Sequence, residues 1–124
     1  MRGEAALSEL PVLDPKLLQD LLNLGAPAGL VQELIALFQE DVPARIAALH
    51  MALGSLDARQ TLQEAHQLKG SLASMGLVRF AALASRIEVL AREGHLEQAP
   101  PLAEALPAAY AEALLALNGA FPEA

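Results

Sequence analysis

The chain has 124 residues, and its 26 alanines and 26 leucines far outnumber its nine valine, isoleucine and threonine residues. This composition favours helices and excludes an all-β fold. Apolar residues make up 54% of the chain, enough for a buried core in a single domain. The absence of cysteine excludes disulfides, thiolate metal sites and cysteine nucleophiles.

Charge and hydropathy bear on the partners that the chain can have. The net charge of −7 disfavours binding to nucleic acid. No uncharged apolar run approaches the roughly 20 residues that cross a bilayer, and no signal peptide is visible. We therefore expect a monomeric cytoplasmic protein that binds neither a membrane nor nucleic acid. One segment differs from the rest, because residues 57–92 hold five basic and three acidic residues, a local net charge of +2.

The first predicted helix is short and runs from Pro15 to about Leu24. Asp14 can cap its free N–H groups, and a proline at the first helical position loses no hydrogen bond. Gly25 and Pro27 then end the helix.

A long second helix is predicted from Ala28 to Leu53, because apolar residues recur there at spacings of three and four. Pro43 removes one backbone hydrogen bond and is expected to bend this helix. Gly54 is expected to close it.

Three further helices follow. Asp57 begins one that runs toward Met75 and ends before Gly76, and the next covers about Val78 to Glu93 and ends at Gly94. Because Pro107 interrupts the last apolar stretch, only residues 107–117 are predicted as firmly helical.

These elements predict an all-α fold, an antiparallel four-helix bundle with the short first helix across one end. The bundle is expected to span residues 13–119. Residues 1–12 are expected to be a flexible N-terminal segment and residues 120–124 a C-terminal tail.

His66 has unusual neighbours on its predicted helix. At 100° per residue it lies well away from the apolar stripe and shares a face with two cations, Arg59 and Lys69, and two small residues, Gly70 and Ala73. A glycine inside a helix costs about 1 kcal/mol relative to alanine, so Gly70 indicates either clearance for a large partner or close helix packing.

The segment AHQLKGSLASMG, residues 65–76, resembles the signature of histidine phosphotransfer (HPt) domains, which has a histidine followed by lysine at three, glycine at four and glycine at ten residues. The similarity extends to FQEDVPARIAAL at residues 38–49 and RIEVLAREG at residues 86–94. The resemblance implies that His66 is phosphorylated and shuttles a phosphoryl group to and from aspartates of receiver domains in a phosphorelay. The implied partners are a receiver domain of a hybrid sensor histidine kinase and a response regulator.

The residues themselves are suited to such roles. A neutral imidazole can attack phosphorus without a separate base, and Lys69 can offset charge on the phosphoryl oxygens, with Arg59 as a further candidate phosphate contact. Glu88 on the next predicted helix can hold the proton of the other ring nitrogen, or it can pair with Arg92 four residues on. Gly70 and Ala73 would give clearance for docking.

Other features of the chain point to no second site. His50 and His95 are expected to be surface residues, no metal site is predicted, and the chain is expected to need no cofactor of its own, with Mg²⁺ held by the receiver. Candidate docking residues on the first helix are Leu17, Leu18 and Leu21.

Two other functions compete with the phosphorelay shuttle. One is a phosphoacceptor module of a chemotaxis-type kinase, which takes phosphoryl directly from an ATP-bound kinase domain. The other is a non-catalytic helical adaptor. In each reading the chain has no kinase activity of its own. A dimerisation and phosphoacceptor domain of a sensor kinase is disfavoured, because an acidic residue normally follows its histidine and Gln67 stands here.

Overall fold

The computed structural model describes residues 6–27 and 29–122, and every regular element in these ranges is a helix. The all-helical fold predicted from the sequence is thus confirmed. In chain order, the elements are the 3₁₀ helix η1 (Leu7–Glu9), α1 (Lys16–Asn23), α2 (Gly29–Gly54), α3 (Ala58–Ser74), α4 (Val78–Arg92), the 3₁₀ helix η2 (Leu96–Gln98), α5 (Pro100–Glu104) and α6 (Leu106–Ala120).

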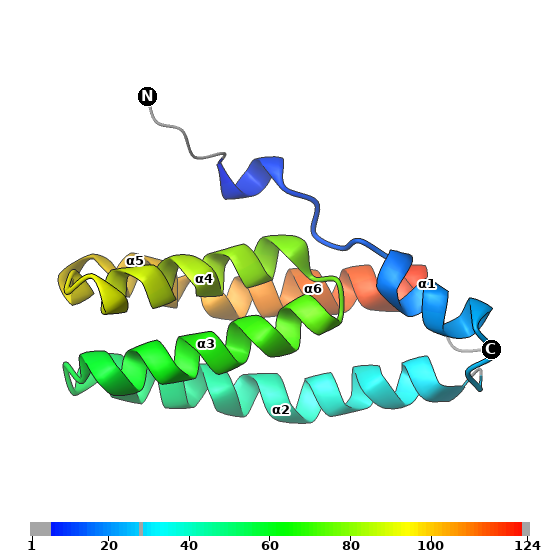
Figure 1. Ribbon diagram of the computed structural model, residues 1–124, viewed down its shortest axis with the longest axis horizontal. Helices are drawn as coiled ribbons and strands as arrows, with labels where there is room; N and C mark the ends of the chain where they lie inside the picture. Colours follow the sequence, from blue (N-terminus) through cyan, green and yellow to red (C-terminus); the bar gives the residue numbers. More distant parts are fainter. Residues whose placement is uncertain (1–5, 28, 123–124) are drawn as a thin grey trace.

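Four long helices, α2, α3, α4 and α6, lie side by side along the long axis of the molecule, and α1 lies at one end (Figure 1). The most extensive packing is between α3 and α4, while α2 packs on α3 and on α6. None of the helices in the described ranges is both long enough and apolar enough to cross a membrane.

The core is built from the apolar stripes predicted for these helices. Burying a large aliphatic or aromatic side chain contributes about 1.5–3 kcal/mol. The largest side chains that are fully enclosed come from every major helix and include Leu18, Leu49, Leu68, Leu72, Phe80, Ile87, Leu106 and Leu117. Leu18 belongs to α1, so the short first helix is anchored by its own buried side chain.

Gly54 is the last residue of α2, as predicted. It is not the left-handed residue of the α2–α3 turn, because Leu56 adopts the positive φ of 56° instead. The N–H of Leu56 donates to Leu53 O at 3.0 Å and that of Asp57 to Ala52 O at 3.0 Å. These two hydrogen bonds at the end of a helix require a left-handed residue, which is usually a glycine. Here that residue is Leu56.

The last helix also differs from its prediction. Residues 100–104 form α5, and α6 begins at Leu106 and extends to Ala120. Ala105 separates α5 from α6, so the predicted interruption is present and falls just before Pro107. Pro107 itself lies in the first turn of α6, where a missing N–H leaves no bond unmade. Phe121 is buried in the core and its carbonyl accepts a bond from Gln32, so the predicted tail over residues 120–124 begins later; residues 123–124 lie outside the described ranges.

The N-terminal segment crosses the α3–α4 turn and is bonded to it. The backbone N–H of Asp14 donates to Gly76 O at 2.8 Å, and the N–H of Arg79 donates to Pro11 O at 3.1 Å. The Arg79 guanidinium also donates to the carbonyls of Leu10 and Ser8. Residues 8–11, predicted to belong to a flexible segment over residues 1–12, are therefore bonded to α4. Residues 1–5 lie outside the described ranges.

Gly76 is required by this crossing for two reasons. Its φ is +78°, and a Cβ built on it would lie 2.3 Å from the carbonyl oxygen of Asp14. Both a left-handed conformation and a backbone contact of this kind exclude a side chain.

We expect Gly76→Ala to lower the free energy of unfolding by at least about 1–2 kcal/mol, the usual cost of a left-handed non-glycine residue. Urea unfolding followed by circular dichroism measures this change. Gly54→Ala is the matched control, because a Cβ there meets nothing within 4 Å, and it should leave stability unchanged or raised. A Gly76→Ala variant as stable as the parent would contradict the assigned role.

Candidate functional site

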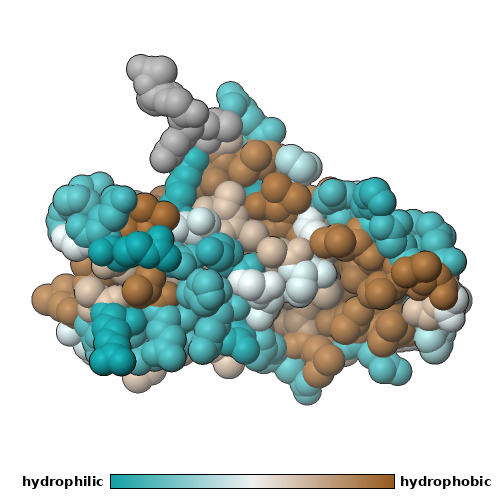
Figure 2. All heavy atoms as spheres, in the orientation of Figure 1, coloured by the Kyte–Doolittle hydropathy of each residue, from teal (hydrophilic) through white to brown (hydrophobic). Residues whose placement is uncertain are grey.

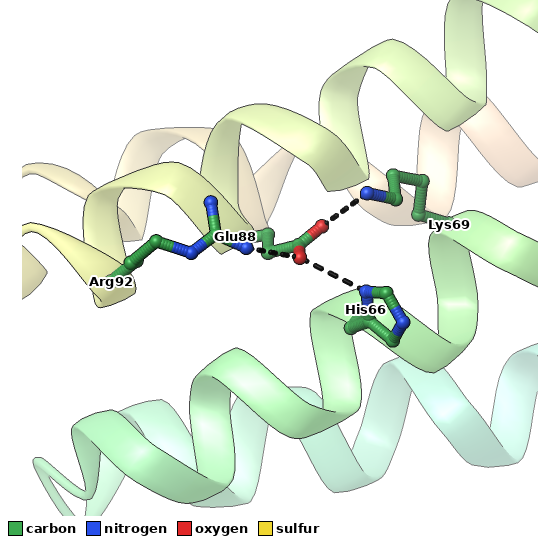
Figure 3. A network of polar contacts seen from close by, with 4 residues as sticks. All are labelled: His66, Lys69, Glu88 and Arg92. Carbon is green, nitrogen blue, oxygen red and sulfur yellow. Dashed lines mark hydrogen bonds and ion pairs between the residues drawn. The ribbon is translucent and has the colours of Figure 1, made fainter.

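His66 lies on the outer face of α3, opposite the buried residues Ala65, Leu68 and Leu72. Its side chain is 65% exposed. The ring nitrogen Nδ1 lies 3.0 Å from Oε2 of Glu88, while Nε2 points away from that carboxylate (Figure 3). The imidazole is thus held at one nitrogen and open at the other.

Glu88 is a buried carboxylate on the neighbouring helix α4, and only 2% of the residue is exposed. Its Oε2 contacts Nδ1 of His66 and the guanidinium of Arg92, the latter at 2.6 Å. Its Oε1 lies 2.7 Å from Nζ of Lys69, in an ion pair. Figure 3 shows the three partners converging on this one carboxylate from two helices.

The charge of Glu88 is decided by two opposing effects. Burial raises the pKa of the Glu88 carboxyl, and this is the largest single effect. The contacts with Lys69, His66 and Arg92 act in the other direction and together leave the pKa of Glu88 below its ordinary value. The group is therefore an ionised carboxylate near neutral pH.

An ionised carboxylate can only accept hydrogen bonds. Nδ1 of His66 must therefore donate to Glu88, which places the proton of a neutral imidazole on Nδ1. Nε2 then carries the lone pair and faces outward. The arrangement gives a nucleophilic nitrogen in a fixed orientation.

Two cations of the site make contacts that the sequence predicted only in part. The ammonium of Lys69, predicted to be available to a phosphoryl group, is paired with Glu88 instead. Arg92, considered only as an alternative partner of Glu88, contacts that carboxylate at the same time as His66 does. The contact between Arg92 and Glu88 was indicated by their spacing of four residues on one predicted helix.

Arg59 lines a surface hollow of about 390 Å³ beside His66, together with Leu62, Gln63, Glu88 and Arg92. Among the residues that the structure describes, it has no hydrogen-bond or ion-pair partner. Arg59 therefore lies next to the candidate site without belonging to the bonded cluster.

Gly70 and Ala73 are both exposed on the same side of α3. A Cβ added to Gly70 would meet nothing within 4 Å. Close helix packing therefore does not explain this glycine, because a side chain here would meet no atom of the described chain.

The other two histidines have separate surroundings. His50, expected at the surface, is half-buried, and its Nε2 lies 2.7 Å from Ala103 O, where it connects α2 to α5. His95 is exposed and lies 3.8 Å from a carboxylate oxygen of Glu97. Within residues 6–27 and 29–122, no cluster of three or more His, Asp or Glu side chains could hold a metal ion.

Comparison with known proteins identifies relatives of this chain. The family model of the Hpt domain matches residues 33–116. The crystal structure of histidine-containing phosphotransfer protein B (HptB) from Pseudomonas aeruginosa PAO1 superposes with a TM-score of 0.79 at 30% sequence identity, covering 88% of this chain and 93% of that one. No curated protein matches the chain. The matched residues contain all of α3 and α4, with His66 and its cluster, and the chain therefore belongs to the Hpt domain family.

Proposed function

We propose that this protein is a phosphorelay shuttle that carries a phosphoryl group on Nε2 of His66 between the aspartates of two receiver domains. The observation that carries the proposal is the exposed imidazole whose Nδ1 is held by a buried carboxylate. The framework for this function, in our proposal, is an antiparallel four-helix bundle of α2, α3, α4 and α6 with α1 across one end.

The proposed transfer step is a displacement at phosphorus. The Nε2 lone pair forms the N–P bond while the bond from phosphorus to the aspartyl oxygen breaks, and the electron pair of that bond returns to the aspartate as carboxylate. The proton stays on Nδ1, so the ring becomes a phosphorylated imidazolium. Glu88, already bonded to Nδ1, stabilises the positive charge that forms on the ring. Transfer to the second receiver is the reverse of this step.

Charge on the phosphoryl oxygens requires nearby cations. We propose Lys69, three residues after His66 on the same helix face, as the principal one. Arg59 is a second candidate, since it has no ion-pair partner among the described residues and lies beside His66. Mg²⁺ would be held by the receiver, and the shuttle supplies no metal ligand in this proposal.

A receiver domain would dock on the α3 face around Gly70 and Ala73. On the α2 side of this face, a shallow hollow of about 340 Å³ is lined mainly by apolar side chains, among them Leu34 and Leu37 of α2 and Met75, which follows α3. Leu17 and Leu21 of α1 are also exposed, whereas Leu18, a third candidate docking residue, is buried in the core. Figure 2 shows apolar surface over α1 and the adjoining part of α2. We propose a receiver of a hybrid sensor kinase as donor and a response regulator as acceptor.

We expect a panel of receiver domains, charged with acetyl phosphate and Mg²⁺, to include donors that label this protein with acid-labile, base-stable phosphate. His66→Gln should abolish the label, because no other described histidine has a comparable site. His95→Gln is the control and should keep the label, since its side chain is exposed and lies outside the cluster. Label retained in His66→Gln would refute the assignment.

We expect Gly70→Ala to raise the free energy of unfolding by about 0.5–1 kcal/mol, because alanine is the better helix former and its methyl group meets open space. The larger Gly70→Leu should slow phosphorylation by a receiver domain but not by phosphoramidate, a donor too small to contact residue 70. Quenched time courses with each of the two donors measure these phosphorylation rates. Equal rates from the receiver for the parent and Gly70→Leu would contradict a docking role.

A further inference from the structure

The cluster around Glu88 holds more positive charge than the carboxylate needs. One buried carboxylate contacts two cations, Lys69 and Arg92, in addition to the ring of His66. A buried carboxylate must keep at least one close counter-charge, because an unpaired buried charge is strongly destabilising. With both cations present, one of them can leave.

We propose that Arg92 is a positioning residue that serves as the permanent counter-charge of Glu88 and so allows Lys69 to move from Glu88 to the phosphoryl group on His66. This inference rests on the proposed function and adds a rearrangement to it. Arg92 acts through Glu88 and Lys69 in this scheme.

The geometry separates the two cations. Lys69 lies on Oε1 of Glu88, whereas Arg92 and Nδ1 of His66 share Oε2. Departure of Lys69 therefore leaves the orienting contact to His66 intact. Arg92 and Glu88 are four residues apart on α4, so their pair is independent of α3.

Lys69 is suited to move. It is on α3 with His66, its side chain is 34% exposed, and its ammonium ends a flexible four-carbon stem. Figure 3 shows its side chain reaching across from α3 to Glu88 while Arg92 approaches the carboxylate from the other side. The move breaks one ion pair and forms another.

Charge accounting shows why the second cation matters. Before phosphorylation, Glu88, Lys69 and Arg92 together carry one positive charge. The phosphorylated ring adds one positive charge and the phosphoryl group two negative ones, so the cluster becomes neutral. Without Arg92 the same cluster would end with one negative charge, and Lys69 would have to serve Glu88 and the phosphoryl group at once.

The test uses phosphoramidate as the phosphoryl donor and follows the rate at which His66 is labelled. We expect Arg92→Ala to slow labelling about tenfold, which corresponds to about 1.4 kcal/mol in the barrier. Arg92→Lys should restore most of the rate, because lysine at this position still reaches Glu88. Thermal unfolding checks that each variant is folded.

The deciding experiment compares the effect of Glu88→Gln on the labelling rate in the parent protein with its effect in the Arg92→Ala variant. In the parent protein it should slow labelling, because the amide stabilises the imidazolium less than a carboxylate does. In Arg92→Ala it should speed labelling, because an uncharged residue 88 releases Lys69. Arg59→Ala is the charge-matched control, and there Glu88→Gln should slow labelling as it does in the parent.

The inference and the function beneath it fail in different ways. If the parent protein takes no label at His66 from any donor, the proposed function is wrong. If the parent is labelled but Arg92→Ala reacts at the same rate, or Glu88→Gln slows Arg92→Ala as well, the role of Arg92 is overturned and the function stands.

Discussion

The buried carboxylate of Glu88 is the constraint on which the candidate site depends. Taking this group out of water is costly, and the cost is offset only because three partners meet it. Those partners come from both α3 and α4, so the carboxylate links the two helices at the level of His66. The same contacts that keep Glu88 charged fix which nitrogen of His66 carries the proton. The same set of contacts therefore stabilises the carboxylate and orients the imidazole ring.

The packing of α3 against α4 fixes the position of His66 relative to Glu88. His66 and Glu88 are 22 residues apart in the chain, and they meet because α3 and α4 pack closely along their apolar stripes. The buried faces of these helices, with Leu68 and Leu72 on α3 and Ala84 and Ile87 on α4, leave little freedom for rotation. The turn between them is further held by the N-terminal segment, through Gly76 and Arg79. An exposed imidazole is thus held on a rigid pair of helices.

Much of the helical architecture could be predicted from the sequence, because periodic leucines and glycine or proline punctuation are local signals. The positions of α1 to α4 follow from them to within a few residues. The turn at Leu56 could not be predicted, since a leucine at positive φ runs against the usual preferences. The bonds between the N-terminal segment and Arg79 could not either, because they join residues about 70 positions apart. The start of α6 at Leu106, in contrast, lies one residue from the start predicted at Pro107.

Within the site, helical spacing and the resemblance to HPt domains together brought His66, Lys69 and Glu88 forward as candidates. It could not show that Lys69 pairs with Glu88 or that Arg92 shares an oxygen with His66, because side-chain direction depends on how two helices are rotated against each other. The open space over Gly70 likewise became visible only in three dimensions, and it excludes close helix packing as the reason for that glycine.

The most direct test of the account is the ¹⁵N NMR spectrum of the His66 ring at neutral pH, with chemical shifts and couplings to the ring protons. The account predicts a proton on Nδ1 and an unprotonated Nε2, and predicts that this preference weakens in Glu88→Ala. A ring protonated mainly on Nε2, or one whose tautomers are populated as in free histidine, would contradict it.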